Sequence, residues 1–367
     1  MEGFDGRADD VTVAHENSSA VIAPNAPAGD APVGALARRE AQLDARLALG
    51  ATRSDGAGTR ARREEPDEYR TCFERDRDRI LHSSAFRRLA GKTQVFIFPE
   101  DHLRTRLTHA LEVAQVATGV ARAVGLNVAL TEAIALGHDC GHGPGGHASE
   151  EAFDPYVEDG FDHATWGADV SLTSLNLCVE TLDGIRNHSW SRPAPRTPEG
   201  EVVSWADRIA YVCHDFEDAR AVGLVTNDQL PAPVVGRCGV RRGEQLGSFI
   251  NAMIRTINAT GVIGMDAAHA EALAAFRSFN YEAIYLSEPS RDQAAAVVAT
   301  LRALVEHYAA HPQLISDHAD RGAPGSPAQR LHEAVAYVAG MTDRFACRSA
   351  LSQLNWPVDR LPYGLDR

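Results

Sequence analysis

Amphipathic segments with helical spacing follow one another from Tyr69 almost to the end of the chain, and Gly and Pro separate them. No run of alternating β-branched residues suggests a sheet. The sequence therefore predicts an all-α fold. The expected helices are Leu103 to Val124, Val128 to His138, Val202 to Ala221, Glu244 to Ala259, Ala267 to Phe276, Asp292 to Ala310 and Pro327 to Phe345. Loops are expected at PAPRTPEG (193–200) and DRGAPGSP (320–327).

Composition divides the chain into four parts. Residues 1–33 contain almost no large apolar side chains, so we expect a disordered tail, because little apolar surface can offset the entropy of ordering. A helix at 34–49 and a polar loop are expected within residues 34–68. A helical core at 69–225 and a C-terminal helical region at 226–367, packed on that core, complete the predicted organisation.

Composition and charge exclude several classes of protein. No uncharged apolar run of eighteen residues occurs, and the start MEGFDGRADD does not resemble a secretory signal, so no membrane partner is expected. The six cysteines lack paired spacing and are expected to be reduced, in the cytoplasm. A net charge of -14 argues against nucleic acid as the main partner. A small anion can still bind where a few Arg residues and a cation line a pocket.

The segment GHDCGHGPGGHASEE, residues 137–151, places three His, one Asp and two Glu around a Gly-rich turn. Leu130, Ile134 and His138 are spaced by four, so His138 should leave its helix on the apolar side. Asp139 follows directly. An imidazole and a carboxylate are suitable ligands for Mn, Fe, Co, Ni or Zn, and this pair is the first half of a candidate metal site.

Two further candidate ligands lie on other predicted helices. His109 precedes Val113, Val116 and Val120 at offsets of four, seven and eleven, which places its imidazole on an interior stripe. On a later helix, Asp207, Tyr211 and Asp215 recur every four residues and share one face. Two acids and a phenol on one face suggest a polar pocket.

Each of these residues has an ordinary structural interpretation when taken alone. His109 could be a hydrogen-bonded core histidine, and Asp207 could be a helix N-terminal charge or half of an ion pair. The cluster at 137–151 could be a solvated loop. The joint occurrence of His, then His-Asp, then Asp on separate helices favours a metal site.

The order His109, His138-Asp139, Asp207 resembles the H…HD…D signature of the HD phosphohydrolase superfamily. Flanking strings narrow the resemblance to its deoxyguanosinetriphosphate triphosphohydrolase-like branch, over about residues 60–355. The strings are FERDRDRILHSSAFRRLAGKTQVF (73–96), RTRLTHALEVAQVA (104–117), LTEAIALGHDCGHGPGGHASE (130–150), LNLCVETLDGI (175–185), WADRIAYVCHD (205–215) and AGMTDRFA (339–346).

The resemblance implies an HD-domain helical bundle that binds one divalent metal ion, with Mn, Mg, Fe, Co, Ni and Zn as candidates. By matching positions, the ligands would be His109, His138, Asp139 and Asp207. Such a set leaves coordination positions open for water and a phosphate oxygen, as a catalytic site requires. The implied reaction releases a deoxynucleoside and inorganic triphosphate from a deoxynucleoside triphosphate.

The resemblance also implies roles for other residues. Those matching the proton-transfer positions are His142, His147, Glu150 and His163. His147 and Glu150 are three apart, so a helix that begins there would let the carboxylate orient the imidazole. The residues matching substrate contacts are Arg106, Arg208 and Tyr211 for the triphosphate, and Gln94 and Asp215 for the sugar hydroxyl. For His142 and His163, an orienting role beside the catalytic groups is the alternative.

Two positions depart from the family pattern. Gly145 stands where the family has an aromatic residue, so a looser loop and an open pocket wall are expected. Ala164 stands where an Asn usually follows the histidine matched by His163. This substitution bears on the contribution of His163 and on substrate preference.

Three functional classes remain open on the sequence. The first is an active dNTP triphosphohydrolase, and the second is another HD activity, such as a nucleotidase or a hydrolase of a signalling nucleotide. The third is a nucleotide sensor without turnover, against which the proton-transfer residues His147 and Glu150 argue. The resemblance further implies a homo-oligomer and a nucleotide activator. No motif indicates the base preference.

Overall fold

The structure is a computed structural model that describes residues 34–98, 102–315 and 326–362. These residues form fifteen α-helices and several short 3-10 and π turns, which are joined by loops. Two isolated bridges and no β-strand occur among them. The predicted all-α class is therefore confirmed. The predicted tail, 1–33, and residues 320–325 of the predicted DRGAPGSP loop lie outside the described residues. No described helix is long and apolar enough to cross a membrane.

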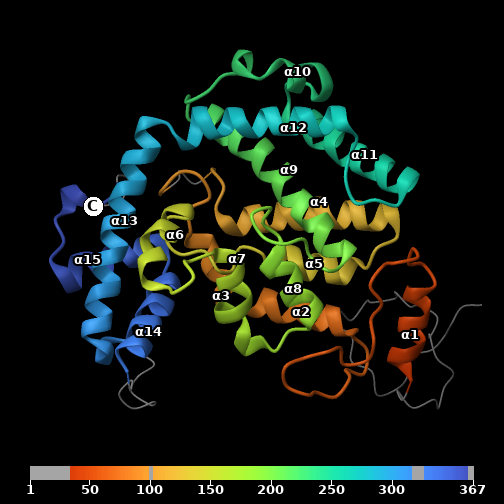
Figure 1. The fold of residues 1–367 in the computed structure, drawn as a ribbon, viewed down its shortest axis with the longest axis horizontal. Coiled ribbons are helices and arrows are strands. Elements are labelled where there is room, and N and C mark those ends of the chain that lie inside the picture. Colours follow the sequence, from red (N-terminus) through yellow and green to blue (C-terminus); the bar gives the residue numbers. More distant parts are fainter. Residues whose placement is uncertain (1–33, 99–101, 316–325, 363–367) are drawn as a thin grey trace, which may run out of the picture.

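The centre of the molecule is a bundle in which α4 packs on α5 and α9, and α2 packs on α5 (Figure 1). Helices α8, α11 and α12 pack around α9. The helices of this half are α1 (Ala35–Asp44), α2 (Cys72–His82), α3 (Ser84–Arg88), α4 (Arg106–Val124), α5 (Val128–Gly137), α8 (Val179–Asn187), α9 (Pro198–Ala221), α10 (Ala232–Cys238), α11 (Arg242–Thr260) and α12 (Ala267–Asn280).

The ends of α4 and α5 follow from their sequences. Gly125 ends α4 in the left-handed conformation at φ 76°, which glycine adopts without steric cost. Asn127 then caps α5, because its side chain accepts a hydrogen bond from the Leu130 amide at 3.2 Å. The predicted apolar stripes are buried in the core, including Val113, Val120 and Ile134. Burying each such side chain contributes about 1.5–3 kcal/mol.

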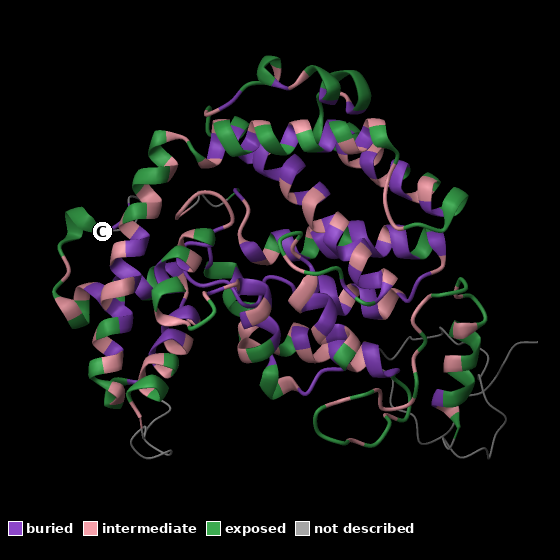
Figure 2. Ribbon diagram, viewed as in Figure 1, coloured by how far each residue is buried: buried purple, intermediate pink, exposed green. Residues whose placement is uncertain are grey.

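A second apolar core lies toward the C-terminal side, where α13 packs on α6, α14 and α15 (Figure 2). The helices of this half are α6 (His147–Phe153), α7 (His163–Trp166), α13 (Glu288–Ala310), α14 (Pro327–Ala339) and α15 (Asp343–Leu354). A π-helical turn, Tyr281–Tyr285, precedes α13. The loop 138–146 runs between the two cores, with Cys140 in the first and α6 leading into the second.

Several predicted helix boundaries differ from the observed ones, and three of them are described here. The helix expected at Pro327 to Phe345 is two helices, because Gly340 ends α14 and Thr342 caps α15 by accepting the Phe345 amide. The loop expected at 193–200 ends early, since Thr197 caps α9 and Pro198 occupies its first turn, where a missing amide hydrogen has no cost. The first helix stops at Asp44 rather than at residue 49.

Candidate metal and catalytic site

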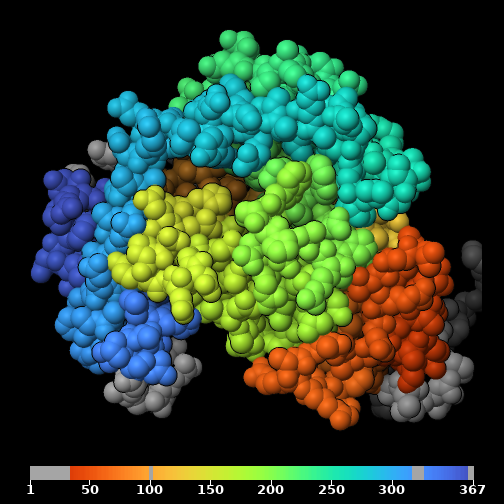
Figure 3. Space-filling model, in the orientation of Figure 1, coloured from red at the N-terminus to blue at the C-terminus, as the bar shows by residue number. Residues whose placement is uncertain are grey.

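A cavity of about 880 Å³ opens between the bundle and the C-terminal helices. Figure 3 shows the hollow between the segment around α6 and α7 (yellow), α8 and α9 (green), and α12 and α13 (cyan to blue). Its size is that of a site for a small organic ligand. The lining includes eleven of the thirteen predicted site residues: Gln94, Arg106, Asp139, His142, His147, Glu150, His163, Asp207, Arg208, Tyr211 and Asp215. The remaining two, His109 and His138, are buried beside Asp207.

Three helices bring the predicted metal ligands together. His109 lies in the first turn of α4, His138 follows the last residue of α5, and Asp207 lies in the middle of α9. The Oδ1 atom of Asp207 is 3.0 Å from His109 Nε2 and 3.6 Å from His138 Nε2. Ligand atoms bound at about 2.0–2.2 Å to one ion are separated by distances of this order. His109, His138 and Asp207 therefore form a group able to hold a metal ion.

Asp139 approaches this group from the cavity side. Its Oδ1 atom is 3.5 Å from His138 Nε2, and its Oδ2 atom accepts a 2.8 Å hydrogen bond from Arg106 Nη1. Arg106 and the neighbouring imidazoles outweigh the burial of Asp139 and hold the pKa of its carboxyl well below the usual range. The carboxylate is therefore ionised and available as the fourth ligand.

The hydrogen bonds of His138 fit a bound cation. Its Nδ1 atom lies 2.7 Å from the Ala135 carbonyl oxygen, so Nδ1 carries a proton, and Nε2 offers a lone pair when the ring is neutral. That lone pair is buried, has no hydrogen-bond partner and faces the oxygens of Asp139 and Asp207. Burial would lower the pKa of His138, but the two carboxylates raise it to about 9. A positive charge at Nε2, whether a proton or a metal ion, attracts the carboxylates of Asp139 and Asp207 and relieves the repulsion between these two carboxylates.

The predicted proton-transfer residues form a second group beside the first. Helix α6 begins at His147, which meets the condition set above for this pair, and the His147 Nδ1 atom is 3.5 Å from Glu150 Oε2. Glu150 lies closer to His163 than to His147, because its Oε1 atom forms a short hydrogen bond with His163 Nδ1. His142 stacks on His163 with the ring centroids 3.7 Å apart. The His147 side chain is 75% exposed, so it is the member of this group most open to a ligand.

His142 connects the two groups. Its Nε2 atom is 3.3 Å from Asp139 Oδ1. Burial, together with the positive charges of Arg106 and His163, lowers the pKa of His142 well below its usual value. A neutral His142 can donate one hydrogen bond to Asp139. Because it carries no positive charge, it does not repel a metal ion bound nearby.

His188 was not predicted, although it lies only three residues beyond the quoted string LNLCVETLDGI. Its Nδ1 atom is 2.8 Å from the Ile185 carbonyl oxygen, and its Nε2 atom is 3.2 Å from His163 Nε2. Burial lowers the pKa of His188 to about 4, so the ring is neutral and accepts at Nε2. His163 therefore lies between the two residues, with its Nε2 atom facing His188 and its Nδ1 atom facing Glu150.

The far side of the cavity carries arginine and tyrosine side chains. The Arg208 guanidinium lies over the Trp190 ring, 3.5 Å from its centroid, and Arg277 Nε donates to the Tyr211 hydroxyl at 3.0 Å. Tyr285 donates a hydrogen bond to Asp215. Trp190, Arg277 and Tyr285 were not predicted, because no motif marks them and two of them come from the C-terminal region.

The two departures from the family pattern occupy tightly packed positions. Gly145 has φ 74°, and a Cβ atom there would lie 2.6 Å from Val297 Cγ1 on α13. A side chain at this position would therefore need both a strained backbone and a shift of α13. Ala164 is fully buried on α7.

Comparisons with known proteins agree with this arrangement. A family model described as HD domain matches residues 106–212, and one described as Phosphohydrolase-associated domain matches residues 263–351. A deoxyguanosinetriphosphate triphosphohydrolase-like protein of Caldanaerobacter subterraneus subsp. tengcongensis is 41% identical over 81% of this chain and 88% of its own length. One from Clostridium perfringens is 37% identical over 83% of this chain and 92% of its own length. The chain belongs to the deoxyguanosinetriphosphate triphosphohydrolase-like family.

Family membership makes this chain an HD-domain phosphohydrolase. The HD match spans the four predicted metal ligands, which are His109, His138, Asp139 and Asp207. It also spans the four predicted proton-transfer residues, which are His142, His147, Glu150 and His163. The second match spans all of α12, α13 and α14 and most of α15. Within it, α12 supplies Arg277 to the cavity and the π-helical turn after α12 supplies Tyr285.

Proposed function

We propose that this protein is a metal-dependent triphosphohydrolase that converts a deoxynucleoside triphosphate to the deoxynucleoside and inorganic triphosphate. One observation carries the proposal: the cation-binding group of His109, His138 and Asp207 lies at the wall of a cavity that also contains proton-transfer groups and arginines. The printed names of the relatives make dGTP the first substrate to test.

The proposed ligands are His109, His138, Asp139 and Asp207, and a divalent ion bound there would polarise the α-phosphate and lower the pKa of the attacking water. Arg106 supports the proposal because it holds Asp139 through Nη1 while its Nε and Nη2 atoms have no hydrogen-bond partner. We assign those two donors to a phosphate oxygen of the substrate, because a guanidinium binds phosphate through such a pair of N–H groups.

Proton transfer is assigned to His147, with Glu150 as the residue that orients it. The departing 5′ oxygen is strongly basic and needs a positioned acid. His147 is suited to this task because it is exposed to the cavity and its Nδ1 atom faces an ionised carboxylate. Neighbouring imidazoles lower the pKa of Glu150 far below its usual value despite its burial.

Substrate orientation is assigned to the opposite wall. Arg208 and Tyr211 are proposed to contact the triphosphate. Asp215 and Gln94 are proposed to contact the sugar hydroxyl, and each has a buried oxygen, Oδ1 and Oε1 respectively, without a hydrogen-bond partner. A carboxylate suits a hydroxyl and repels phosphate, so Asp215 belongs at the sugar end.

Incubation of the purified protein with each dNTP and Mn or Mg, followed by product analysis, tests the proposal. Release of inorganic triphosphate is expected. Release of monophosphate or orthophosphate would instead indicate a nucleotidase or another HD activity, and binding without turnover would indicate a sensor. Pairwise dNTP mixtures and size-exclusion measurements test the proposed nucleotide activator and homo-oligomer, which suit a cytoplasmic enzyme of nucleotide pools.

A further inference from the structure

The strings GKTQVF (91–96) and AGMTDRFA (339–346) meet behind the cavity, and each contributes one buried charged residue. Lys92 is 3% exposed and Asp343 is 6% exposed. Neither takes part in the chemistry proposed above. Asp343 opens α15, directly after the break that separates α14 from α15.

Lys92 joins the loop that carries His142 to the C-terminal helices. Its Nζ atom donates to the His142 carbonyl oxygen and, at 2.9 Å, to the Ala339 carbonyl oxygen at the end of α14. Burial lowers the pKa of Lys92 to about 8. An ammonium group held by two carbonyl oxygens is a directional anchor for both segments.

Asp343 anchors the same loop three residues further on. Its Oδ1 atom accepts from the Gly145 amide at 2.8 Å, and its Oδ2 atom accepts from the Thr93 amide at 2.8 Å and from Thr93 Oγ1 at 2.6 Å. The carboxylate therefore ties the 92–93 segment to the loop. That segment is also joined to the start of α4, because the Arg106 amide donates to the Lys92 carbonyl oxygen at 3.2 Å.

The loop between these anchors carries few constraints of its own. Gly145 and Gly146 both have positive φ, at 74° and 62°, and glycine is free to leave such conformations. Within the loop and α6, Ser149 accepts from the Gly143 amide and donates to the Gly146 carbonyl oxygen. His142 and His147 stand at the two ends of this glycine-rich turn, so its conformation sets their separation.

We propose that Lys92 and Asp343 are positioning residues that hold loop 142–147 in the conformation needed for proton transfer by His147. The inference rests on the proposed function, and it extends that function to the junction of α14 and α15. The C-terminal helices thereby control turnover in a site whose metal ligands all lie in the HD domain. A displacement of about 1 Å at such a loop can cost about 100-fold in rate.

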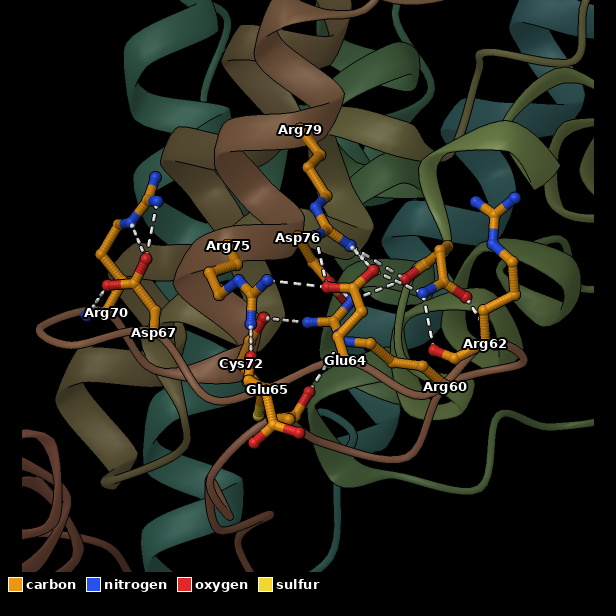
Figure 4. Close-up of polar contacts among 12 residues, drawn as sticks. Arg60, Arg62, Glu64, Glu65, Asp67, Arg70, Cys72, Arg75, Asp76 and Arg79 are labelled. Carbon is orange, nitrogen blue, oxygen red and sulfur yellow. Dashed lines mark hydrogen bonds and ion pairs between the residues drawn. The ribbon is translucent and has the colours of Figure 1, made fainter.

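The chain offers a matched control in Asp76, a buried carboxylate that does not line the cavity. Figure 4 shows it among its polar neighbours on α2. Asp76 accepts from Arg60 Nη1 at 2.6 Å, from the Cys178 amide at 2.8 Å and from Thr181 Oγ1 at 2.7 Å. Like Asp343, it binds one amide and one threonine hydroxyl through a single oxygen. In both residues, Asp→Asn replaces one accepting oxygen by a donor.

The experiment compares Asp343→Asn with Asp76→Asn in the full chain, well below both melting temperatures. Asp343→Asn is expected to lower kcat by about 10-fold or more while KM changes by less than about 3-fold, because the displaced loop carries proton-transfer groups and not the triphosphate contacts. Amide hydrogen exchange in peptides spanning residues 141–148 should accelerate in Asp343→Asn and not in Asp76→Asn. Lys92→Met should shift kcat and exchange in the same direction, without burying a charge.

Equal kcat losses in the two Asn variants, or an unchanged loop exchange in Asp343→Asn, would overturn the inference. These results differ from failure of the proposed function, in which the wild-type protein itself releases no triphosphate from any dNTP. Hydrogen exchange still decides the positioning role in that case. If Asp343→Asn does not fold, Lys92→Met alone decides it by the same two measurements.

Discussion

The two histidine groups of the cavity are built in different ways. His109, His138 and Asp207 are carried by α4, α5 and α9, which pack on one another along much of their lengths. His142, His147, Glu150 and His163 are carried by a glycine-rich loop, the seven-residue α6 and the four-residue α7. Packing of long helices fixes the first group, whereas side-chain hydrogen bonds and anchors from α14 and α15 fix the second.

Under the proposed function, this difference separates cation binding from proton transfer. The helical bundle should hold a metal ion even when the loop is displaced. The loop group, in contrast, should lose catalytic geometry after changes that leave the bundle and its metal ion intact. The predictions below test that separation, beginning with the largest expected effect.

Asp207→Ala should abolish turnover, with a loss beyond the about 10–100-fold typical of residues that only support a ligand. The variant removes the oxygen that faces both His109 and His138. Calorimetric titration with Mn should show lost metal binding, while circular dichroism shows unchanged helical content. Asp359→Ala, at an exposed position, is the control. Full residual turnover in Asp207→Ala would remove the metal assignment.

His147→Ala should lower kcat by about 10²–10⁴-fold, the range for loss of a general acid or base. Metal affinity should not change, because His147 lines the cavity and does not belong to the group formed by His109, His138 and Asp207. Its exposure also allows added imidazole to restore part of the rate. Loss of metal binding in this variant would contradict the separation of the two groups.

Asp215 is an internal reference, because it is a buried acid that lines the same cavity and does not belong to either histidine group. Burial raises the pKa of its carboxyl to about 7, although the Tyr285 hydrogen bond opposes the shift. The folded state therefore disfavours the charged form, and wild-type stability should fall relative to Asp215→Asn as the pH rises from about 4 to about 7. The difference in unfolding free energy should grow by up to about 4 kcal/mol and then level off. Denaturant titrations at several pH values measure it, and a constant difference would contradict the raised pKa.

His188→Gln should have the smallest of these effects, about a 10-fold loss of kcat, the size expected for an orienting partner. His188 touches both groups, since its ring packs on His138 at 4.9 Å between centroids and its Nε2 atom accepts from His163. An unchanged Mn affinity assigns it to the loop group. A large loss of Mn affinity would make it a metal ligand and would merge the two groups.

The sequence predicts the positions of His109, His138 and Asp207 because each of them lies on or next to a regular helix. Offsets of four, seven and eleven place His109 on the buried side of α4, and the same reasoning places Asp207, Tyr211 and Asp215 on one face of α9. The assigned roles of all these residues stay predictions.

Contacts between distant loops escaped prediction. The bond between Glu150 and His163, and the contact of His163 with His188, depend on how short helices meet, which periodicity does not describe. The break at Gly340 was missed because one glycine and one threonine interrupt a pattern that otherwise continues. Gly145 was expected to loosen its loop, yet its amide is held by Asp343.

Anomalous diffraction from crystals soaked in Mn tests the central claim most directly. The account predicts one strong peak within about 2.0–2.3 Å of His109 Nε2, His138 Nε2 and a carboxylate oxygen of each of Asp139 and Asp207. A peak held instead by His142, His147, Glu150 and His163, or no peak beside His138, would contradict it.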